Sequence, residues 1–209
     1  MHGRRGLESD TFFEMALRDA QLVPGLEGST HINLQMAAQF AGKYFDRRPP
    51  EIEPPKSLLA HEIASIENPY LTQARTGATN TISFSHFLKP YAPLIHIKNV
   101  RTFARQVKAF EVFLRSRPKD SPDTTTIALG HCFATIAYAQ LVAEHAVKLH
   151  LPAEIISTIF HTLILDLSTS ALSLATTLDK SLHRPLRRLM LIPSTPASNW
   201  DFVATQISF

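Results

Sequence analysis

The spacing of apolar residues in the second half of the chain constrains the fold most strongly. They recur every three or four positions, as in Ile156, Phe160, Leu163, Leu167, Ala171, Leu174 and Leu178. Such spacing places them along one side of an α-helix. A second segment repeats the pattern with Val100, Phe103, Val107, Phe110 and Leu114. No alternating pattern strong enough to build a sheet accompanies these segments, so the sequence predicts an all-α protein.

Proline and glycine punctuate this pattern and set the expected helix limits. Helices are predicted over 10–21, from Ser29 or Thr30 to Phe45, over 57–67, from Asn99 to Arg117, over 125–150 and over 152–182, with an irregular segment at 70–96. On the helix that follows Ser29, the predicted apolar stripe is Ile32, Met36, Phe40 and Phe45. Three long helices with short connections favour an antiparallel bundle.

Residues 46–56 contain four prolines, which remove backbone donors and predict a stiff, extended connector. We therefore divide the chain into residues 1–46, a linker at 47–56 and a helical extension at 57–209.

Composition allows a substantial core, because 44% of the residues are hydrophobic and only 19% are charged. A membrane-spanning helix needs about 20 nearly uncharged residues. The most apolar segment, 155–178, carries Asp166 at its middle, so we interpret it as a buried helix. No apolar stretch follows the charged N-terminal residues, which predicts no signal peptide and a cytoplasmic location, with an organelle left open.

The distribution of charge argues against nucleic-acid binding, and the single cysteine argues against a reactive thiol site. The net charge is +3, but basic residues are locally dense only at 47–50 and 183–188 and no aromatic residues are interleaved with them. The sequence therefore predicts no nucleic-acid partner. Segment 183–188 is either a solvated cap or a contact for acidic headgroups or a CoA phosphate. The single cysteine, Cys132, lies in an apolar run and is predicted to be buried and inert.

Histidine and serine patterns yield no further site. The candidates for metal binding or proton relay are His31, His131, His145, His150 and His161. His145 and His150 are five residues apart, not the three or four that align ligands on a helix, so we interpret the histidines as structural and predict no metal. No G-x-S-x-G turn follows a strand, which leaves a hydrolase unsupported.

Glycine is concentrated near the N-terminus, where five of the seven glycines fall within the first 42 residues. Because glycine allows positive φ and close approach of another molecule, chemistry is expected there. Glu27 lies between Gly25 and Gly28 and precedes Ser29. Considered alone, Glu27 is a helix-capping acid stabilised by the helix dipole.

The segment RDAQLVPGLEGSTHIN, residues 18–33, resembles the end of the C-terminal helical domain of the acyl-CoA dehydrogenase and oxidase family. There an Arg-Asp-Ala run leads into a Glu-Gly-Thr turn and then a helix. The segment GRRGL, residues 3–7, is similar to the glycine-rich turn that precedes this region in the family. The two motifs occur in the family's order and at the family's distance.

The resemblance implies an FAD-dependent oxidoreductase of fatty acid metabolism. Glu27 would remove the α proton of an acyl-CoA thioester while the β hydride passes to the flavin, and Gly28 would let the thioester lie against the backbone. The residues implied to contact FAD are Gly3, Gly6, Ser29, Thr30 and His31. The flavin would be held mainly by a neighbouring subunit.

The sequence departs from the family pattern in two residues and in its domain content. Arg4 stands where the second glycine is usual and Ser29 where threonine is usual. The helical and β domains that bind most of the flavin in the family have no counterpart here. We therefore expect a subunit or C-terminal portion that is inactive alone and works with a partner carrying those domains, or as a homo-oligomer.

The extension at 57–209 resembles the extra C-terminal bundle of very-long-chain dehydrogenases and acyl-CoA oxidases, by position and helical character. In those proteins the bundle serves dimer contacts or membrane association. The alternative interpretation is a non-enzymatic helical interaction or scaffold protein that retains the old turn.

Overall fold

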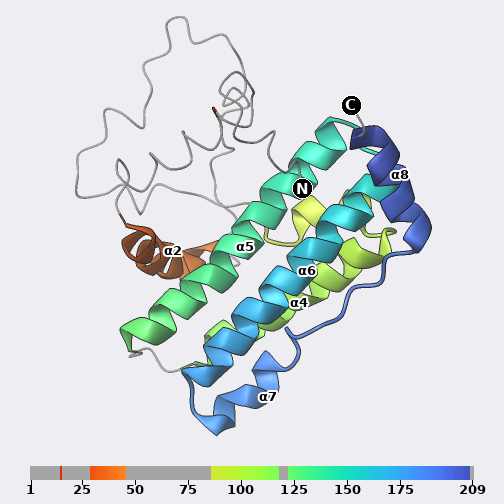
Figure 1. Cartoon of the computed structure of the whole chain (residues 1–209). Coiled ribbons are helices and arrows are strands. Elements are labelled where there is room, and N and C mark those ends of the chain that lie inside the picture. Colours follow the sequence, from red (N-terminus) through yellow and green to blue (C-terminus); the bar gives the residue numbers. More distant parts are fainter. Residues whose placement is uncertain (1–14, 16–28, 46–85, 118–121, 208–209) are drawn as a thin grey trace, which may run out of the picture.

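Three long helices form the centre of the protein (Figure 1), in a computed structural model that describes residues 15, 29–45, 86–117 and 122–207. They are α4 (Lys98–Ser116), α5 (Asp123–Lys148) and α6 (Ala153–Thr176). α6 packs against both α4 and α5, and α5 runs antiparallel to α6. Within the described ranges all regular structure is helical, which confirms the predicted all-α class.

Shorter elements close the sides of this three-helix core. α2 (Thr30–Tyr44) packs on α5, and the 3₁₀ helix η2 (Lys89–Leu94) lies against α5 and α4. After α6 follow the 3₁₀ helix η3 (Lys180–Leu182) and α7 (His183–Leu186). Residues 189–196, here called the strap, then lead to α8 (Ala197–Ile207), which packs on α6.

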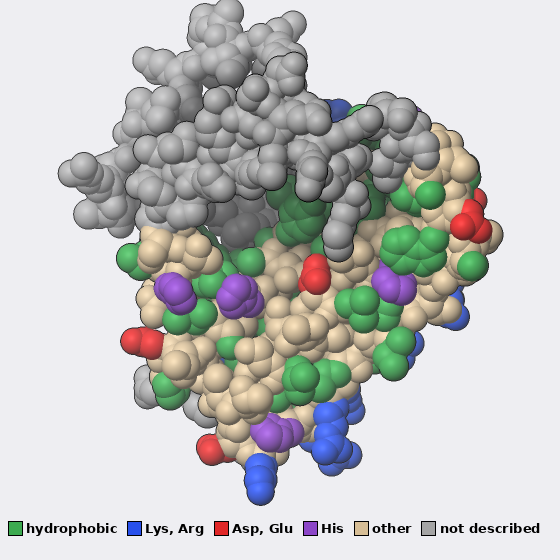
Figure 2. All heavy atoms as spheres, in the orientation of Figure 1, with side chains coloured by type: hydrophobic (Ala, Val, Ile, Leu, Met, Phe, Trp, Pro, Cys, Tyr) green, Lys and Arg blue, Asp and Glu red, His purple; other side chains and the backbone are tan. Residues whose placement is uncertain are grey.

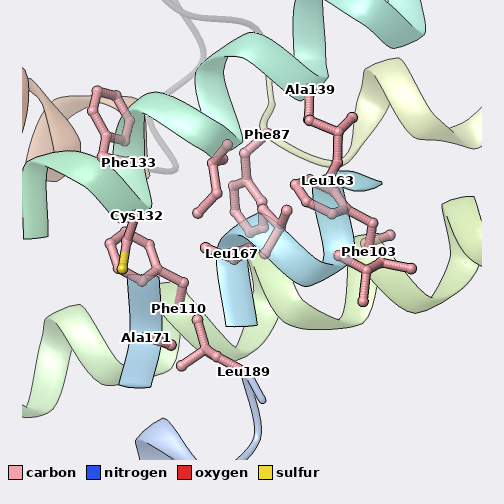
Figure 3. Close-up of a cluster of buried hydrophobic side chains, with 14 of the residues drawn as sticks. Phe87, Phe103, Phe110, Cys132, Phe133, Ala139, Leu163, Leu167, Ala171 and Leu189 are labelled. Atoms are coloured by element: carbon pink, nitrogen blue, oxygen red, sulfur yellow. The ribbon is translucent and has the colours of Figure 1, made fainter. Parts of the chain in front are cut away.

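The buried sides of α4 and α6 follow the predicted periodicity. All predicted stripe residues are buried apart from Leu114 and Leu178, which are partly buried. Phe103 of α4 and Phe160 of α6 meet edge to face, with ring centroids 5.5 Å apart. Figure 3 shows side chains of all three long helices meeting in this core. Burial of these side chains holds the helices together, since apolar area contributes about 25 cal/mol per Å².

α2 begins where predicted but buries a different face. Ile32 and Met36 of the predicted stripe are 54% and 51% exposed, whereas Phe45 is buried. The helix instead directs towards the core Leu34, Ala38, Ala41 and Tyr44. The reason is close packing on α5: a Cβ atom placed on Gly130 would lie only 2.2 Å from the Leu34 carbonyl oxygen. Gly130 allows that approach because it carries no side chain.

The predicted helix over 152–182 is shorter than expected, because α6 ends at Thr176. The Thr177 hydroxyl donates to the Leu174 carbonyl at 2.9 Å, and the Thr177 carbonyl accepts from the Thr125 hydroxyl at 3.3 Å. The bond from Thr125 joins the end of α6 to the start of α5. The chain then turns into η3 and α7, and α7 packs against α4. α8 was not predicted from the sequence.

Several predictions fall on residues outside the described ranges. These are the helices over 10–21 and 57–67 and the linker at 47–56. α2 and the three-helix core share one set of buried residues. The division of the chain at 47–56 stays a prediction.

α5 and α6 are each long and apolar enough to cross a membrane, judged by length and composition alone. In each, 44% of the most apolar stretch is buried inside the protein. Asp166 lies on the exposed side of α6. The cytoplasmic location stays a prediction.

Candidate functional site

Four of the predicted site residues, Gly3, Gly6, Glu27 and Gly28, lie outside the described residues. The other three, Ser29, Thr30 and His31, form the beginning of α2 and are exposed.

The start of α2 presents hydroxyl groups beside backbone amides. Ser29 occupies the N-cap position with φ −63° and ψ 147°, and its carbonyl accepts from the Asn33 N–H at 3.1 Å. The Ser29 hydroxyl makes no capping hydrogen bond. The first N–H groups of a helix have no partner within it and carry partial positive charge, which suits an anionic group. The arrangement is therefore chemically suited to meet phosphate or ribose oxygens.

The other end of α2 is anchored by a chain of hydrogen bonds to α5. The Tyr44 hydroxyl donates to Gln140 Oε1 at 2.5 Å, and Gln140 Nε2 donates to Glu144 Oε1 at 2.8 Å. The Tyr44 ring also packs edge to face on Phe133, with centroids 5.2 Å apart. Burial, reinforced by the Glu144 charge, raises the pKa of Tyr44, so the phenol stays protonated and remains a donor. Together with the contact at Gly130, this bond chain positions the start of α2.

The histidines are dispersed over the described structure. His31, His131, His145 and His150 are exposed. His161 is partly buried, with Nδ1 2.9 Å from the Thr195 hydroxyl and its ring edge-on to Trp200. Within the described ranges, no three His, Cys, Asp or Glu side chains gather in a group that could hold a metal ion.

Cys132 is fully buried in the core, as predicted. Burial raises the pKa of its thiol to about 12. The thiol therefore stays protonated at neutral pH, which makes it a poor nucleophile.

Two buried amides on α4, Asn99 and Gln106, hold the strap and were not predicted from the sequence. Asn99 is 0% exposed; its Nδ2 donates to the Ser157 carbonyl at 2.8 Å and to the Thr195 hydroxyl at 2.7 Å. Asn99 Oδ1 accepts from the Ser194 N–H at 3.0 Å. The bonds join the starts of α4 and α6 to the end of the strap.

Gln106 repeats this role two turns further along α4. Its Nε2 donates to the Leu189 carbonyl at 2.5 Å and to the Ser168 hydroxyl at 3.0 Å. Ser168 in turn accepts from the Leu191 N–H at 3.1 Å. The seven-residue spacing of Asn99 and Gln106, beside the apolar stripe, was the sequence signal that could have revealed them.

Two shallow hollows occur in the described structure. One, of about 330 Å³, is lined by Lys89, Pro90, Pro93, Glu144 and Val147. The other, of about 260 Å³, is lined by Leu172, Ala175, Thr176, His183, Arg187 and Met190. Neither includes the start of α2, so they do not extend the predicted site.

Comparison with protein-family models, curated proteins and solved structures finds no match for this chain.

Proposed function

We propose that the chain is a subunit or C-terminal portion of an FAD-dependent, acyl-CoA dehydrogenase-like oxidoreductase, inactive alone, in which Glu27 is the base for α,β-dehydrogenation of an acyl thioester. The observation that carries this proposal is the ordered pair GRRGL and RDAQLVPGLEGSTHIN, with a helix that begins at Thr30, within the second motif.

The chemistry assigned to Glu27 is proton abstraction at the α carbon of the thioester. Exclusion of water raises the pKa of a carboxylate and makes it a stronger base. Gly28, without a Cβ atom, lets the thioester lie against the backbone. FAD, shared with a partner chain, would supply the hydride acceptor. Ser29, Thr30 and His31 support this assignment because their exposed position at the start of α2 suits contacts with phosphate and ribose groups.

The test uses the purified 209-residue chain, first alone and then mixed with a candidate partner subunit that carries the helical and β domains typical of the family. Alone, the chain should lack the absorbance band of oxidised flavin and show no activity. With the partner and an acyl-CoA, flavin reduction should occur and should be abolished by Glu27→Gln. The matched control is Glu14→Gln, which removes an acid from the preceding segment and should leave the rate unchanged. A rate that is unaffected by Glu27→Gln removes Glu27 from the chemistry.

A non-enzymatic helical interaction protein is the second candidate. It is favoured by apolar side chains on the outer surfaces of the long helices, including Tyr138, Leu141 and Leu172, which are 60%, 58% and 57% exposed. Under this alternative, partner binding persists in Glu27→Gln and no acyl-CoA is consumed by any combination of subunits.

A further inference from the structure

The outer side of α4 carries a row of cations that is interrupted once, by the exposed Val112. Lys98, Arg101, Arg105, Lys108 and Arg115 are all exposed. Their spacings of three, four, three and seven residues place them on one side of the helix, opposite the buried Phe103 and Phe110. At a rise of 1.5 Å per residue, the row is about 26 Å long. Cations that are dispersed in the sequence are therefore aligned by helical geometry.

The segment that follows α6 adds to this row. Lys180, Arg184, Arg187 and Arg188 are exposed, and α7 packs against α4. Gln106 of α4 holds the chain just after these cations through the Leu189 carbonyl. In Figure 2, which views the side of α5 and α6, blue Lys and Arg side chains are sparse over the middle and gather at the lower end, where α7 lies in Figure 1. We call the outer side of α4 together with residues 180–188 the basic face.

Few acids neutralise the basic face. Among the described residues, α4 and residues 179–188 contain nine Lys and Arg but two acids, Glu111 and Asp179. Glu111 is 2% exposed, so it faces inward, and its carboxylate pairs with Arg115 at 2.6 Å. The remaining described acids lie on α5, α6 and α8.

Some cations of the row have hydrogen-bond partners within the protein and others do not. Lys98 Nζ donates to the Ser194 hydroxyl at 3.0 Å, and Arg101 Nε donates to the Ile95 carbonyl at 3.1 Å. Arg105 and Lys108, at the centre of the row, have no hydrogen-bond or ion-pair partner among the described residues. These two side chains are the most available for an external anion.

In place of the sequence-based prediction of no nucleic-acid partner, we propose that the basic face binds the phosphate backbone of duplex nucleic acid without reading its base sequence. A row of about 26 Å matches about eight base pairs at 3.4 Å each. Single-strand binding relies on exposed aromatic rings for base stacking, whereas Phe103, Phe110 and Phe113 of α4 are fully buried. The amides suited to base reading, Asn99 and Gln106, are also buried and engaged with the strap. The exposed charged side chains of this surface are Lys and Arg, the residues that neutralise phosphates.

The test measures fluorescence anisotropy of a labelled random-sequence 20-base-pair DNA duplex with the full chain at several salt concentrations. The parent should bind, with affinity falling steeply as salt rises. Arg105→Gln combined with Lys108→Gln should weaken binding about tenfold at 50 mM salt. It should also reduce the log–log salt slope by about 1.8, because each neutralised phosphate accounts for about 0.9 of that slope. The matched control, Lys89→Gln combined with Lys148→Gln, removes the same charge elsewhere and should stay within about twofold of the parent.

Three results overturn the proposal: a parent that does not bind the duplex at 50 mM salt, equal weakening by both pairs of substitutions, or tighter binding to phosphatidylserine vesicles than to the duplex. The third result would indicate that the basic face binds the surface of an anionic membrane. Circular dichroism of each variant verifies that the helices are intact. The proposal does not involve Glu27, so its failure leaves the dehydrogenase hypothesis unchanged.

Discussion

Replacing Gly130 by alanine tests the packing of α2 on α5. The same substitution at Gly42 serves as the control, because it should change the free energy of unfolding in the opposite direction. At Gly130 the new Cβ atom would lie 2.2 Å from the oxygen and 2.8 Å from the carbon of the Leu34 carbonyl. Both are backbone atoms, so α2 must shift as a unit. At Gly42, within α2, no atom lies within 4 Å of the added Cβ. The pair separates packing from helix propensity.

The expected magnitudes follow from two opposing effects. Glycine inside a helix costs about 0.5–1 kcal/mol relative to alanine, and both substitutions recover that amount. Overpacking costs about 1–3 kcal/mol, and Gly130→Ala alone incurs it, at the upper end because backbone atoms clash. Gly130→Ala should therefore lower the free energy of unfolding by about 2 kcal/mol, whereas Gly42→Ala should raise it by about 0.5–1 kcal/mol.

Urea unfolding followed by far-ultraviolet circular dichroism measures both free energies. In thermal unfolding, 1 kcal/mol corresponds to about 2–4 °C for a chain of this size. If Gly130→Ala stabilises the protein as much as Gly42→Ala, the close approach of α2 to α5 is refuted.

Two further predictions concern the core and the strap. Burial raises the pKa of the Cys132 thiol from 9.0 to about 12. Between these two pH values only the unfolded state loses the thiol proton. The free energy of unfolding should therefore fall by about 1.4 kcal/mol for each unit that the pH rises through this range. Urea unfolding at pH 8, 9 and 10 measures the trend, and rapid labelling of the native thiol by Ellman's reagent at pH 8 would contradict its burial. Asn99→Leu removes the hydrogen-bond acceptor of the Ser194 N–H and should lower the free energy of unfolding by about 1–3 kcal/mol. The strap leads into α8, so emission of Trp200, the one tryptophan, should shift to the red; an unshifted spectrum with parental stability argues against this role of Asn99.

Local patterns in the sequence were sufficient to predict most of the helices. The starts of α2, α4, α5 and α6 fall within two residues of the predicted positions. This follows because apolar periodicity and proline act over a few residues, where no tertiary contact is needed. The candidate site is a sequence result too: Glu27 and Gly28 rest on the resemblance, and the structure adds the exposed position of Ser29, Thr30 and His31.

Tertiary structure decided what local patterns cannot specify. The buried face of α2 depends on Gly130, which is almost a hundred residues away, and the early end of α6 depends on a bond from Thr125 to Thr177. The strap depends on buried amides of α4 whose partners lie up to 96 residues further along the chain. The basic face required helical geometry to bring its cations into line and packing of α7 to extend them. The sequence alone determined which segments become helices, whereas contacts between distant residues determined which side of each helix is buried and which side remains available for a partner.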